Sequence, residues 1–357
     1  MKQPIRPAKV FNIIIIAQRG RLSFEAALFA LSLRHTNPDF AGRLFIATPA
    51  HNTLWPQDPS LAAGPLRDLL SQQGGEFVEF ESRDFGQTYP YGNKIEALEV
   101  LPAGEAFVFF DSDTLITGDL RDVPFDFARP GASLRCEGTW PKISEKTPGH
   151  ATIWRALYDR YSLDFTGSLD CARHATDWRR YLYFNAGFFY YRCPKVFGQL
   201  YRAYAVDIRD DPPPELLGQT LDPWLDQVAL PLVIHALGGG RDSLPHGFLD
   251  GRHSCHYRFI PLLYARESDA VVTLLDELTS PDHVKSVLDN HPPYRRLIYE
   301  RHGLRLRQMF DQSALPQTEQ MIRKTIKQTG LWLRKLANDS CAKFEIASRY
   351  LSAKLFR

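Results

Sequence analysis

Short, mostly apolar runs recur in the first third of the chain, and helix-like segments rich in Ala and Leu separate them. The four runs are 11–17 (FNIIIIA), 43–48 (RLFIAT), 77–80 (FVEF) and 107–110 (FVFF). Strands that alternate with helices build βα units and hence a mostly parallel sheet. Runs without polar alternation are typical of strands buried on both faces. The sequence therefore predicts an α/β fold with a mostly parallel central sheet flanked by helices.

The second half of the chain is less regular and then becomes helical and polar. Strands are expected at 132–136, 184–192 and 255–263, and helices at 153–161, 196–208 and 224–236. From Pro281 onward the sequence is polar and helical, with an interruption at Pro292 and Pro293. We therefore expect an α/β domain over residues 1–275, a helical extension over 276–318 and a basic, amphipathic C-terminal tail over 319–357.

Charge is divided unevenly between the body of the chain and its tail. The formal net charge of the 357 residues is +2, but residues 319–357 alone hold nine Lys or Arg and three acidic residues. The rest of the chain is therefore mildly acidic, which argues against a nucleic-acid-binding protein with a uniformly basic surface. The five cysteines are scattered and form no CxxC pair. This pattern favours a reducing compartment, and so the cytoplasm, over a disulfide framework.

Membrane-spanning and targeting segments are not expected. No run approaches the roughly 18 apolar residues of a membrane span. The stretch 1–21 (MKQPIRPAKVFNIIIIAQRGR) superficially resembles a signal peptide, but its apolar core is short and arginines follow at once. It is better interpreted as the approach to a first β-strand.

Two aspartates, Asp111 and Asp113, directly follow the fourth apolar run (VFFDSDTLITGDL). In an extended segment, residues two apart point the same way, and ligands bind at the carboxyl ends of the strands in open α/β sheets. Two carboxylates on one side suit Mg²⁺ or Mn²⁺, usually shared with phosphate oxygens. A turn that ends the strand is the plainer alternative, because Asp and Ser are common in turns.

Two other chemistries use strands that end near acidic or phosphate-binding residues. The motif resembles that of haloacid-dehalogenase-type phosphatases, but their pattern has a residue between the second Asp and Thr-Leu and follows the first strand. Here Thr114 follows Asp113 directly, after about the fourth strand, so a phosphatase is our third choice. The stretch 86–94 (GQTYPYGNK) does not have the spacing of a P-loop and lacks the final Ser or Thr.

Four blocks, in the expected order, resemble the GT-A nucleotide-sugar glycosyltransferases, and in layout they are most similar to glycosyltransferase family eight. The blocks are NKIEAL (93–98), FVFFDSDTLITGDL (107–120), YFNAGFFYYR (183–192) and DPWLDQVAL (222–230). The resemblance implies a GT-A catalytic domain over 1–275 that moves a sugar from a nucleoside-diphosphate sugar to an acceptor, with retention at the anomeric carbon. It also implies Mn²⁺ or Mg²⁺ as cofactor, which stabilises the leaving diphosphate as a Lewis acid.

The resemblance implies roles for the polar residues of these blocks. Asp113 and Asp111 would bind the metal, and Asp111 would also bind the ribose of the donor. Asn185, Ala186 and Gly187 would bind the donor sugar, because Asn bonds to hydroxyl groups and the two small residues allow a close approach. The alternative for these three is a β-bulge with a satisfied Asn side chain.

Three further residues of the blocks are candidates for the donor site. Lys94 would bind the donor, or it is a solvated helix lysine. Asp226 would bind sugar hydroxyls or act on the acceptor, and Gln227 would stabilise positive charge on the sugar in the transition state. The alternative for Asp226 is a helix-start aspartate, which the helix dipole favours.

A third metal ligand is sought among two histidines of GRHSCHYRF (251–259). His253 and His256 are three apart, so in a strand they face opposite ways and at most one can serve. We favour His256 because the sequence after it is apolar, and His253 is the other candidate; each could also be an ordinary surface or core histidine. Arg258 is placed with the donor-binding residues, and Arg19 and Arg21 are further candidates for binding the diphosphate.

The alternative to an enzyme is a catalytically inactive protein of the same fold that binds a nucleotide sugar or serves as a scaffold. The feature that supports it is the lack of the family's Gly-x-x-Lys segment after the histidine. The tail segment 321–337 can place Ile322, Ile326, Leu333 and Leu336 on one helical face. Such a helix either packs on the protein or lies on anionic lipid. The second case implies peripheral binding to the inner face of the membrane and a surface-glycan or lipid-linked saccharide acceptor.

Overall fold

The computed structural model describes residues 10–338, with side chains up to residue 330. The described chain forms two compact units, and it passes from the first to the second between His256 and Tyr257. The sequence placed this boundary after residue 275 and set the tail apart at 319. The structure instead joins 257–338 in one unit, because the first helix after His256 packs against helices of the C-terminal region.

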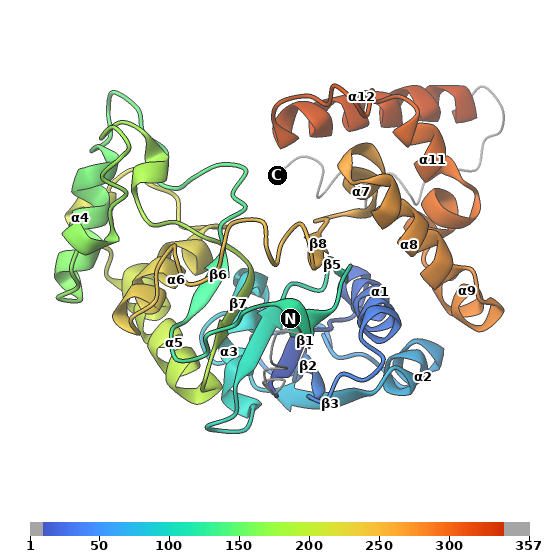
Figure 1. The fold of residues 1–357 in the computed structure, drawn as a ribbon, viewed down its shortest axis with the longest axis horizontal. Helices are drawn as coiled ribbons and strands as arrows, with labels where there is room; N and C mark the ends of the chain where they lie inside the picture. Colours follow the sequence, from blue (N-terminus) through green and yellow to red (C-terminus); the bar gives the residue numbers. More distant parts are fainter. Residues whose placement is uncertain (1–9, 339–357) are drawn as a thin grey trace, which may run out of the picture. The chain divides into compact units, whose positions relative to one another are not determined.

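A six-stranded sheet forms the centre of the first unit (Figure 1). Its strands are β1 (Asn12–Ile16), β2 (Leu44–Pro49), β3 (Gly75–Phe80), β4 (Phe107–Phe110), β6 (Gly131–Ser133) and β7 (Asn185–Tyr191). They lie in the order β3-β2-β1-β4-β7-β6. The first four of these are mutually parallel, whereas β7 is antiparallel to both of its neighbours. The predicted mostly parallel sheet is thus confirmed.

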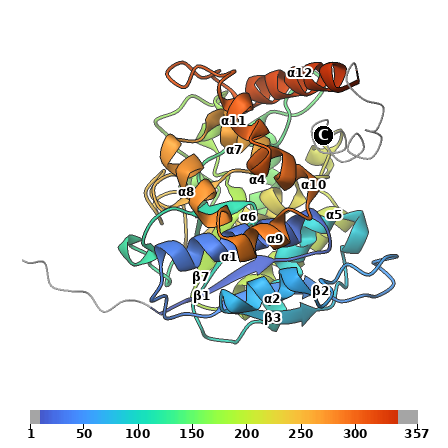
Figure 2. The same cartoon turned by 90° about the vertical axis from the view of Figure 1, so that its right-hand side faces the viewer.

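Helices cover both faces of this sheet. The helices of the first unit are α1 (Arg21–Thr36), α2 (Pro65–Gln72), α3 (Asn93–Glu96), α4 (His150–Arg160), α5 (Pro194–Asp210) and α6 (Leu225–Ala236). α1 and α2 lie side by side on one face (Figure 2), and α5 and α6 pack together on the other (Figure 1). Ile14 and Ile16 belong to the core under α5 and α6, whereas Ile13 and Ile15 point to the opposite face by alternation and are fully buried too. Burial on both faces explains why the run IIII lacks polar residues.

A short antiparallel pair follows the carboxyl end of β4 and consists of β5 (Thr114–Ile116) and β8 (Ser254–His256). The predicted strand over 255–263 is therefore wrong beyond His256. Helix α7 (Ile260–Arg266) follows instead. Pro261 lies in its first turn, where the N–H that proline lacks would have no helical partner. The apolar residues after His256 serve the core of the second unit rather than a sheet.

The second unit is helical, as expected of the C-terminal region. Besides α7 it contains α8 (Asp269–Thr279), α9 (Asp282–Leu288), α10 (Pro292–Tyr294), α11 (His302–Arg307) and α12 (Glu319–Asn338). Its core joins α7, α11 and α12 through Leu262, Ala265, Leu306, Phe310, Ile322 and Ile326.

The described half of the tail helix packs on protein. Ile322 and Ile326 of α12 are buried in the core of the second unit. Of the two alternatives for the tail helix, this part of the apolar face therefore packs on the protein. Leu333 and Leu336 lie outside the described side chains, and residues 339–357 lie outside the described chain. No helix within residues 10–338 combines the length and apolar character that crossing a membrane requires.

One buried carboxylate ties α12 to α7. The Glu319 side chain is 8% exposed and pairs with Arg258 at 3.2 Å, Arg266 at 2.9 Å and Arg323 at 2.5 Å. Burial alone would raise the pKa of Glu319, but the three guanidinium groups hold it below its usual value. Glu319 therefore contributes stability that is complete above the pKa of an unfolded-chain glutamate and is lost as the pH falls below it.

Glu319→Gln should lower the free energy of unfolding by about 3 kcal/mol at pH 7, because it leaves three arginines without their common counter-charge. The loss should be smaller near pH 3, below the pKa of an unfolded glutamate, because the unfolded chain then binds a proton that the folded wild-type carboxylate binds less readily. Urea denaturation at both pH values measures this. Glu300→Gln, at an exposed position of the same unit, is the control and should change little. An equal effect of the two variants would contradict the assigned role.

Candidate functional site

The two aspartates and one histidine converge at the carboxyl end of β4. Asp111 and Asp113 follow Phe110, the last residue of that strand, and pairing of β5 with β8 sets Thr114 opposite His256. His256 Nε2 lies 3.2 Å from Asp113 Oδ1 and 3.7 Å from Asp111 Oδ2. One ligand atom from each of the three lies within 4.8 Å of the other two. The structure thus brings together the three residues expected to bind a metal.

The donor set of this Asp-Asp-His group fits a divalent cation. Two carboxylate oxygens and one imidazole nitrogen face one another, and carboxylates are the ligands that Mg²⁺ and Mn²⁺ prefer. Three protein ligands leave coordination positions for phosphate oxygens or water. The His256 ring is 7% exposed, whereas the Asp111 side chain is 26% exposed, so the group is open on the aspartate side.

His253 does not belong to this group. It immediately precedes β8, its ring is buried, and it lies against the ring of Phe248 with 5.1 Å between centroids. Burial lowers the pKa of His253. Of the two candidate histidines, the structure therefore brings only His256 to the aspartates.

Lys94 holds the carboxylates of two separate blocks together. It lies on α3, is buried, and its Nζ is 2.8 Å from Asp111 Oδ1 and 3.3 Å from Asp226 Oδ2. It also donates a hydrogen bond to the Ala186 carbonyl oxygen at 3.1 Å. Burial alone would lower the pKa of Lys94, but Asp111 and Asp226 keep it above its usual value. Lys94 is therefore a charged, fixed centre of the site and not a solvated helix lysine.

Asp226 is held by a tyrosine that sequence reasoning missed. The Tyr89 hydroxyl lies 2.9 Å from Asp226 Oδ1 and also 2.9 Å from the Asp226 backbone nitrogen. The hydroxyl therefore donates to the carboxylate and accepts from the N–H of the same residue. Burial raises the pKa of Asp226, and Lys94 and the Tyr89 hydroxyl oppose this. Tyr89 lies five residues before Lys94, in a stretch that was tested for a P-loop, and its nearness to Lys94 in the sequence was the only signal that pointed to it.

The Asn-Ala-Gly segment at the start of β7 shapes the site mainly through its backbone. The Asn185 side-chain oxygen accepts a hydrogen bond from the Gly187 N–H at 2.8 Å, and the Gly187 carbonyl oxygen accepts one from the Asp111 N–H at 2.8 Å. A Cβ atom on Gly187 would lie 2.2 Å from His256 Nδ1. Within the described residues, Gly187 thus makes room for the His256 ring, a role not expected from the sequence. An irregular register between β6 and β7, where Asn185 is paired, matches the β-bulge alternative.

The remaining candidates lie in different surroundings. Gln227 accepts a hydrogen bond from the Tyr183 hydroxyl at 3.1 Å, next to Asp226 on α6. Arg21 lies 3.6 Å from Asp113, whereas Arg19 is exposed. Arg258 belongs to the second unit and pairs there with Glu319, so its role in donor binding stays a prediction.

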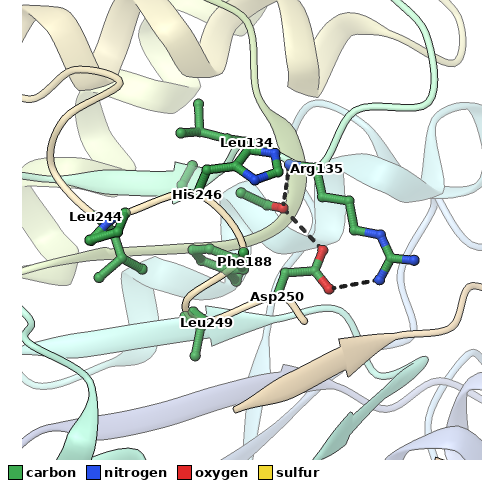
Figure 3. Close-up of a pocket in the computed structure, with 11 residues that line it drawn as sticks. Leu134, Arg135, Phe188, Leu244, His246, Leu249 and Asp250 are labelled. Carbon is green, nitrogen blue, oxygen red and sulfur yellow. Dashed lines mark hydrogen bonds and ion pairs between the residues drawn. The ribbon is translucent and has the colours of Figure 1, made fainter. Parts of the chain in front are cut away.

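A small cavity between β6, β7 and the segment 244–250 is lined by the buried acid Asp250 (Figure 3). The Asp250 carboxylate accepts hydrogen bonds from Ser133 Oγ at 3.2 Å and from the His256 backbone N–H at 3.3 Å, and it pairs with Arg135 at 3.5 Å. The cavity volume is about 10 Å³, which is room for one water molecule. Asp250 therefore supports the strand that carries His256, and the cavity is too small for a sugar.

A family model decides the assignment of the first unit. Residues 13–238, which include both aspartates and Asp226, match the Rhodobacterales glycosyltransferase domain. The chain belongs to this glycosyltransferase family. This agrees with the resemblance to GT-A glycosyltransferases, and membership of family eight is compatible with it. No curated protein matches the chain.

Solved glycosyltransferase structures are similar to the chain at low sequence identity. The galactosyltransferase LgtC, in complex with donor and acceptor sugar analogues, shares 14% identity over 77% of this chain and 99% of its own, with a TM-score of 0.43. The bifunctional glycosyltransferase WbbM shares 14% identity over 84% of this chain and 53% of its own, with a TM-score of 0.41. GlyE of Streptococcus pneumoniae TIGR4 shares 12% identity over 64% and 45%, with a TM-score of 0.35.

Proposed function

We propose that this glycosyltransferase uses a divalent metal and moves a sugar from a nucleoside-diphosphate sugar to a saccharide or glycolipid acceptor. The observation that carries the proposal is the convergence of Asp111, Asp113 and His256 beside Lys94 in a glycosyltransferase domain. The group lies after β4, at the edge of the parallel sheet where ligands of such sheets bind.

The metal-binding residues would work on the leaving group. Asp111, Asp113 and His256 would hold Mn²⁺ or Mg²⁺, which when bound neutralises the charge of the departing diphosphate. Lys94 fixes one Asp111 oxygen and so leaves the other, 3.7 Å from His256 Nε2, for the metal. Asp111 is also open enough to reach a ribose hydroxyl.

The sugar-binding residues would lie on the side of Asp226. Lys94 and Tyr89 fix the Asp226 carboxylate, which would accept hydrogen bonds from sugar hydroxyls. The side-chain oxygen of Gln227, which Tyr183 holds by a hydrogen bond, would face the sugar carbon that gains positive charge. Asn185 would bind a hydroxyl at the same edge. We propose retention of the anomeric configuration, as the Asn-Ala-Gly and Asp-Gln blocks imply.

Gly187→Ala should weaken Mn²⁺ binding at least about tenfold, because the new methyl group would overlap the His256 ring and displace a ligand. Titration of Mn²⁺ followed by electron paramagnetic resonance measures this without any substrate. Gly149→Ala is the control, because a Cβ there has no atom within 4 Å and φ is −72°. Wild-type Mn²⁺ affinity in Gly187→Ala would show that the His256 ring is not a ligand.

Sugar transfer tests the proposal directly. Purified protein is incubated with a panel of nucleoside-diphosphate sugars and simple saccharide acceptors, with Mn²⁺ or with EDTA, and released nucleoside diphosphate is measured. The proposal predicts release that needs the metal, and NMR of the product then gives the anomeric configuration. Donor binding without any turnover would instead support the inactive, nucleotide-sugar-binding alternative.

The basic C-terminal tail could bring the protein to a membrane that carries the acceptor. In the described part of α12, Lys324 is exposed while Ile322 and Ile326 are buried, so lipid contact there would rest on charge. We propose that the tail binds anionic membranes. Co-sedimentation with phosphatidylserine vesicles that fails in high salt would support this, and no co-sedimentation in low salt would contradict it.

A further inference from the structure

We propose that Arg21, together with Glu25, couples metal binding to diphosphate binding. In the donor-free protein Arg21 pairs with Asp113, and with donor bound it turns to the diphosphate. The metal and the nucleoside diphosphate then bind much better together than either binds alone. This inference rests on the proposed function and adds to it the manner in which the site is loaded.

The place of Arg21 is fixed by the start of α1. This helix begins at Arg21, after the carboxyl end of β1, and no side chain caps its N-terminus. Ser112 Oγ, between the two aspartates, donates a hydrogen bond to the Ile16 carbonyl oxygen at the end of β1. The aspartates and the N-terminus of α1 thus lie on the same edge of the sheet. The positive end of a helix dipole and a guanidinium group both favour phosphate oxygens.

The two metal-binding carboxylates are already paired with cations. Asp111 Oδ1 lies 2.8 Å from Lys94 Nζ, and Asp113 Oδ2 lies 3.6 Å from the Arg21 guanidinium group. The other oxygen of each faces His256 Nε2. Lys94 and Arg21 therefore offset part of the negative charge that a metal entering alone would meet, although each is shared with a second carboxylate, Asp226 or Glu25. A diphosphate adds negative charge beside the metal, so the two ligands favour each other's binding.

The two cations differ in how closely they are held at their aspartates. Lys94 is buried and held by two carboxylates and the Ala186 carbonyl oxygen. The Arg21 side chain is 24% exposed, and its distance to Asp113 is longer than that of a hydrogen bond. Arg21 is therefore the cation that can exchange Asp113 for a phosphate.

Glu25 lies one helical turn after Arg21, and its side chain is 1% exposed. Its carboxylate pairs with the Arg21 guanidinium group, which keeps Arg21 over the start of α1 and offsets part of its charge at Asp113. Removal of the Glu25 charge should therefore let Arg21 offset more of the negative charge of Asp113, whereas removal of Arg21 should leave that negative charge without this offset. The two substitutions are expected to move the affinity for metal alone in opposite directions.

The experiment measures binding and needs no activity. The Kd of Mn²⁺ alone is measured by electron paramagnetic resonance on the full-length protein. The Kd of UDP, GDP and ADP is then measured by calorimetry with and without Mn²⁺, and the ratio of the two values for the nucleotide that binds is the coupling factor. The variants are R21Q, the conservative R21K, E25Q and, as control, R121Q, since Arg121 is exposed and pairs with Asp119.

We expect Mn²⁺ alone to bind R21Q about tenfold more tightly and E25Q more weakly than wild type. The coupling factor should fall at least about tenfold in R21Q, stay near wild type in R21K and be unchanged in R121Q. If R21Q weakens Mn²⁺ alone and keeps the coupling factor, Arg21 only orients Asp113 and this inference is overturned. If wild-type protein binds neither Mn²⁺ nor any of the nucleotides, the proposed function fails as well.

Discussion

The Asp113→Asn variant should keep its fold and lose sugar transfer by at least about a thousandfold. Asparagine preserves the shape of the side chain but removes the charge of a metal-facing oxygen that lies 3.2 Å from His256 Nε2. The metal and the metal-dependent part of nucleotide binding should be lost together. Turnover, Mn²⁺ titration and thermal unfolding of the same preparation separate this loss from a loss of fold.

Asp119→Asn is the matched control for this variant. Asp119 lies six residues further along, is partly exposed and pairs with Arg121 at the surface. It should retain transfer within a few-fold of wild type. Asp113→Asn with wild-type transfer in EDTA-treated and Mn²⁺-supplemented samples alike would refute a metal-dependent reaction at this site.

Lys94→Met should abolish transfer and also lower the free energy of unfolding by about 3 kcal/mol at pH 8. The substitution leaves the carboxylates of Asp111 and Asp226 close together without their common cation. The raised pKa of Lys94 means that its stabilisation is complete at every pH below the pKa of an unfolded lysine, about 10.4. The wild type therefore keeps this stabilisation throughout the neutral range.

The pH dependence of Lys94→Met gives a second check. Burial already raises the pKa of Asp226, and loss of Lys94 should raise it further. The variant should then lose stability as the pH rises from 5 to 8, because the folded state holds a proton that the unfolded state releases. Urea denaturation at both pH values measures this, with Lys146→Met at an exposed loop position as control. A variant as stable at pH 8 as at pH 5, relative to wild type, would contradict the buried charge cluster.

The sheet could be predicted from the sequence because its signals are local. Runs such as IIII in β1 and FVFF in β4 lack polar residues since both faces of these strands are covered. The same reasoning failed after His256. An apolar run of β-like composition there forms α7, and the residues that cover it, from Leu306 to Ile326, come from later parts of the chain.

The sequence predicted the site residues that belong to a local motif, but not the contacts between residues that are far apart in the chain. Asp111 and Asp113 could be recognised because they follow a buried strand directly. Tyr89 and Asp226 are 137 residues apart in the sequence, and no local sequence pattern indicates that they are in contact. The fit of the His256 ring over Gly187 likewise appears only when β8 and β7 are placed together.

Arg21 and Glu25 show a partial success of sequence reasoning. Arg21 was a candidate for binding the diphosphate because guanidinium suits phosphate oxygens. Its pairing with Asp113 and with Glu25 depends on the angle at which α1 leaves β1, which the sequence does not specify. The i, i+4 spacing of an arginine and a glutamate at a helix start was the local signal for half of this arrangement.

The most direct test of the central claim is thermal unfolding of the wild-type protein with UDP, GDP, ADP and their sugar conjugates, each with and without Mn²⁺. A ligand that binds only the folded state raises the midpoint by mass action. The account predicts that one nucleoside diphosphate raises the midpoint with Mn²⁺ present and much less without it, and that Asp113→Asn removes the difference. No shift with any of these ligands, or a shift that is the same in EDTA, would contradict a metal-dependent sugar-nucleotide site at Asp111, Asp113 and His256.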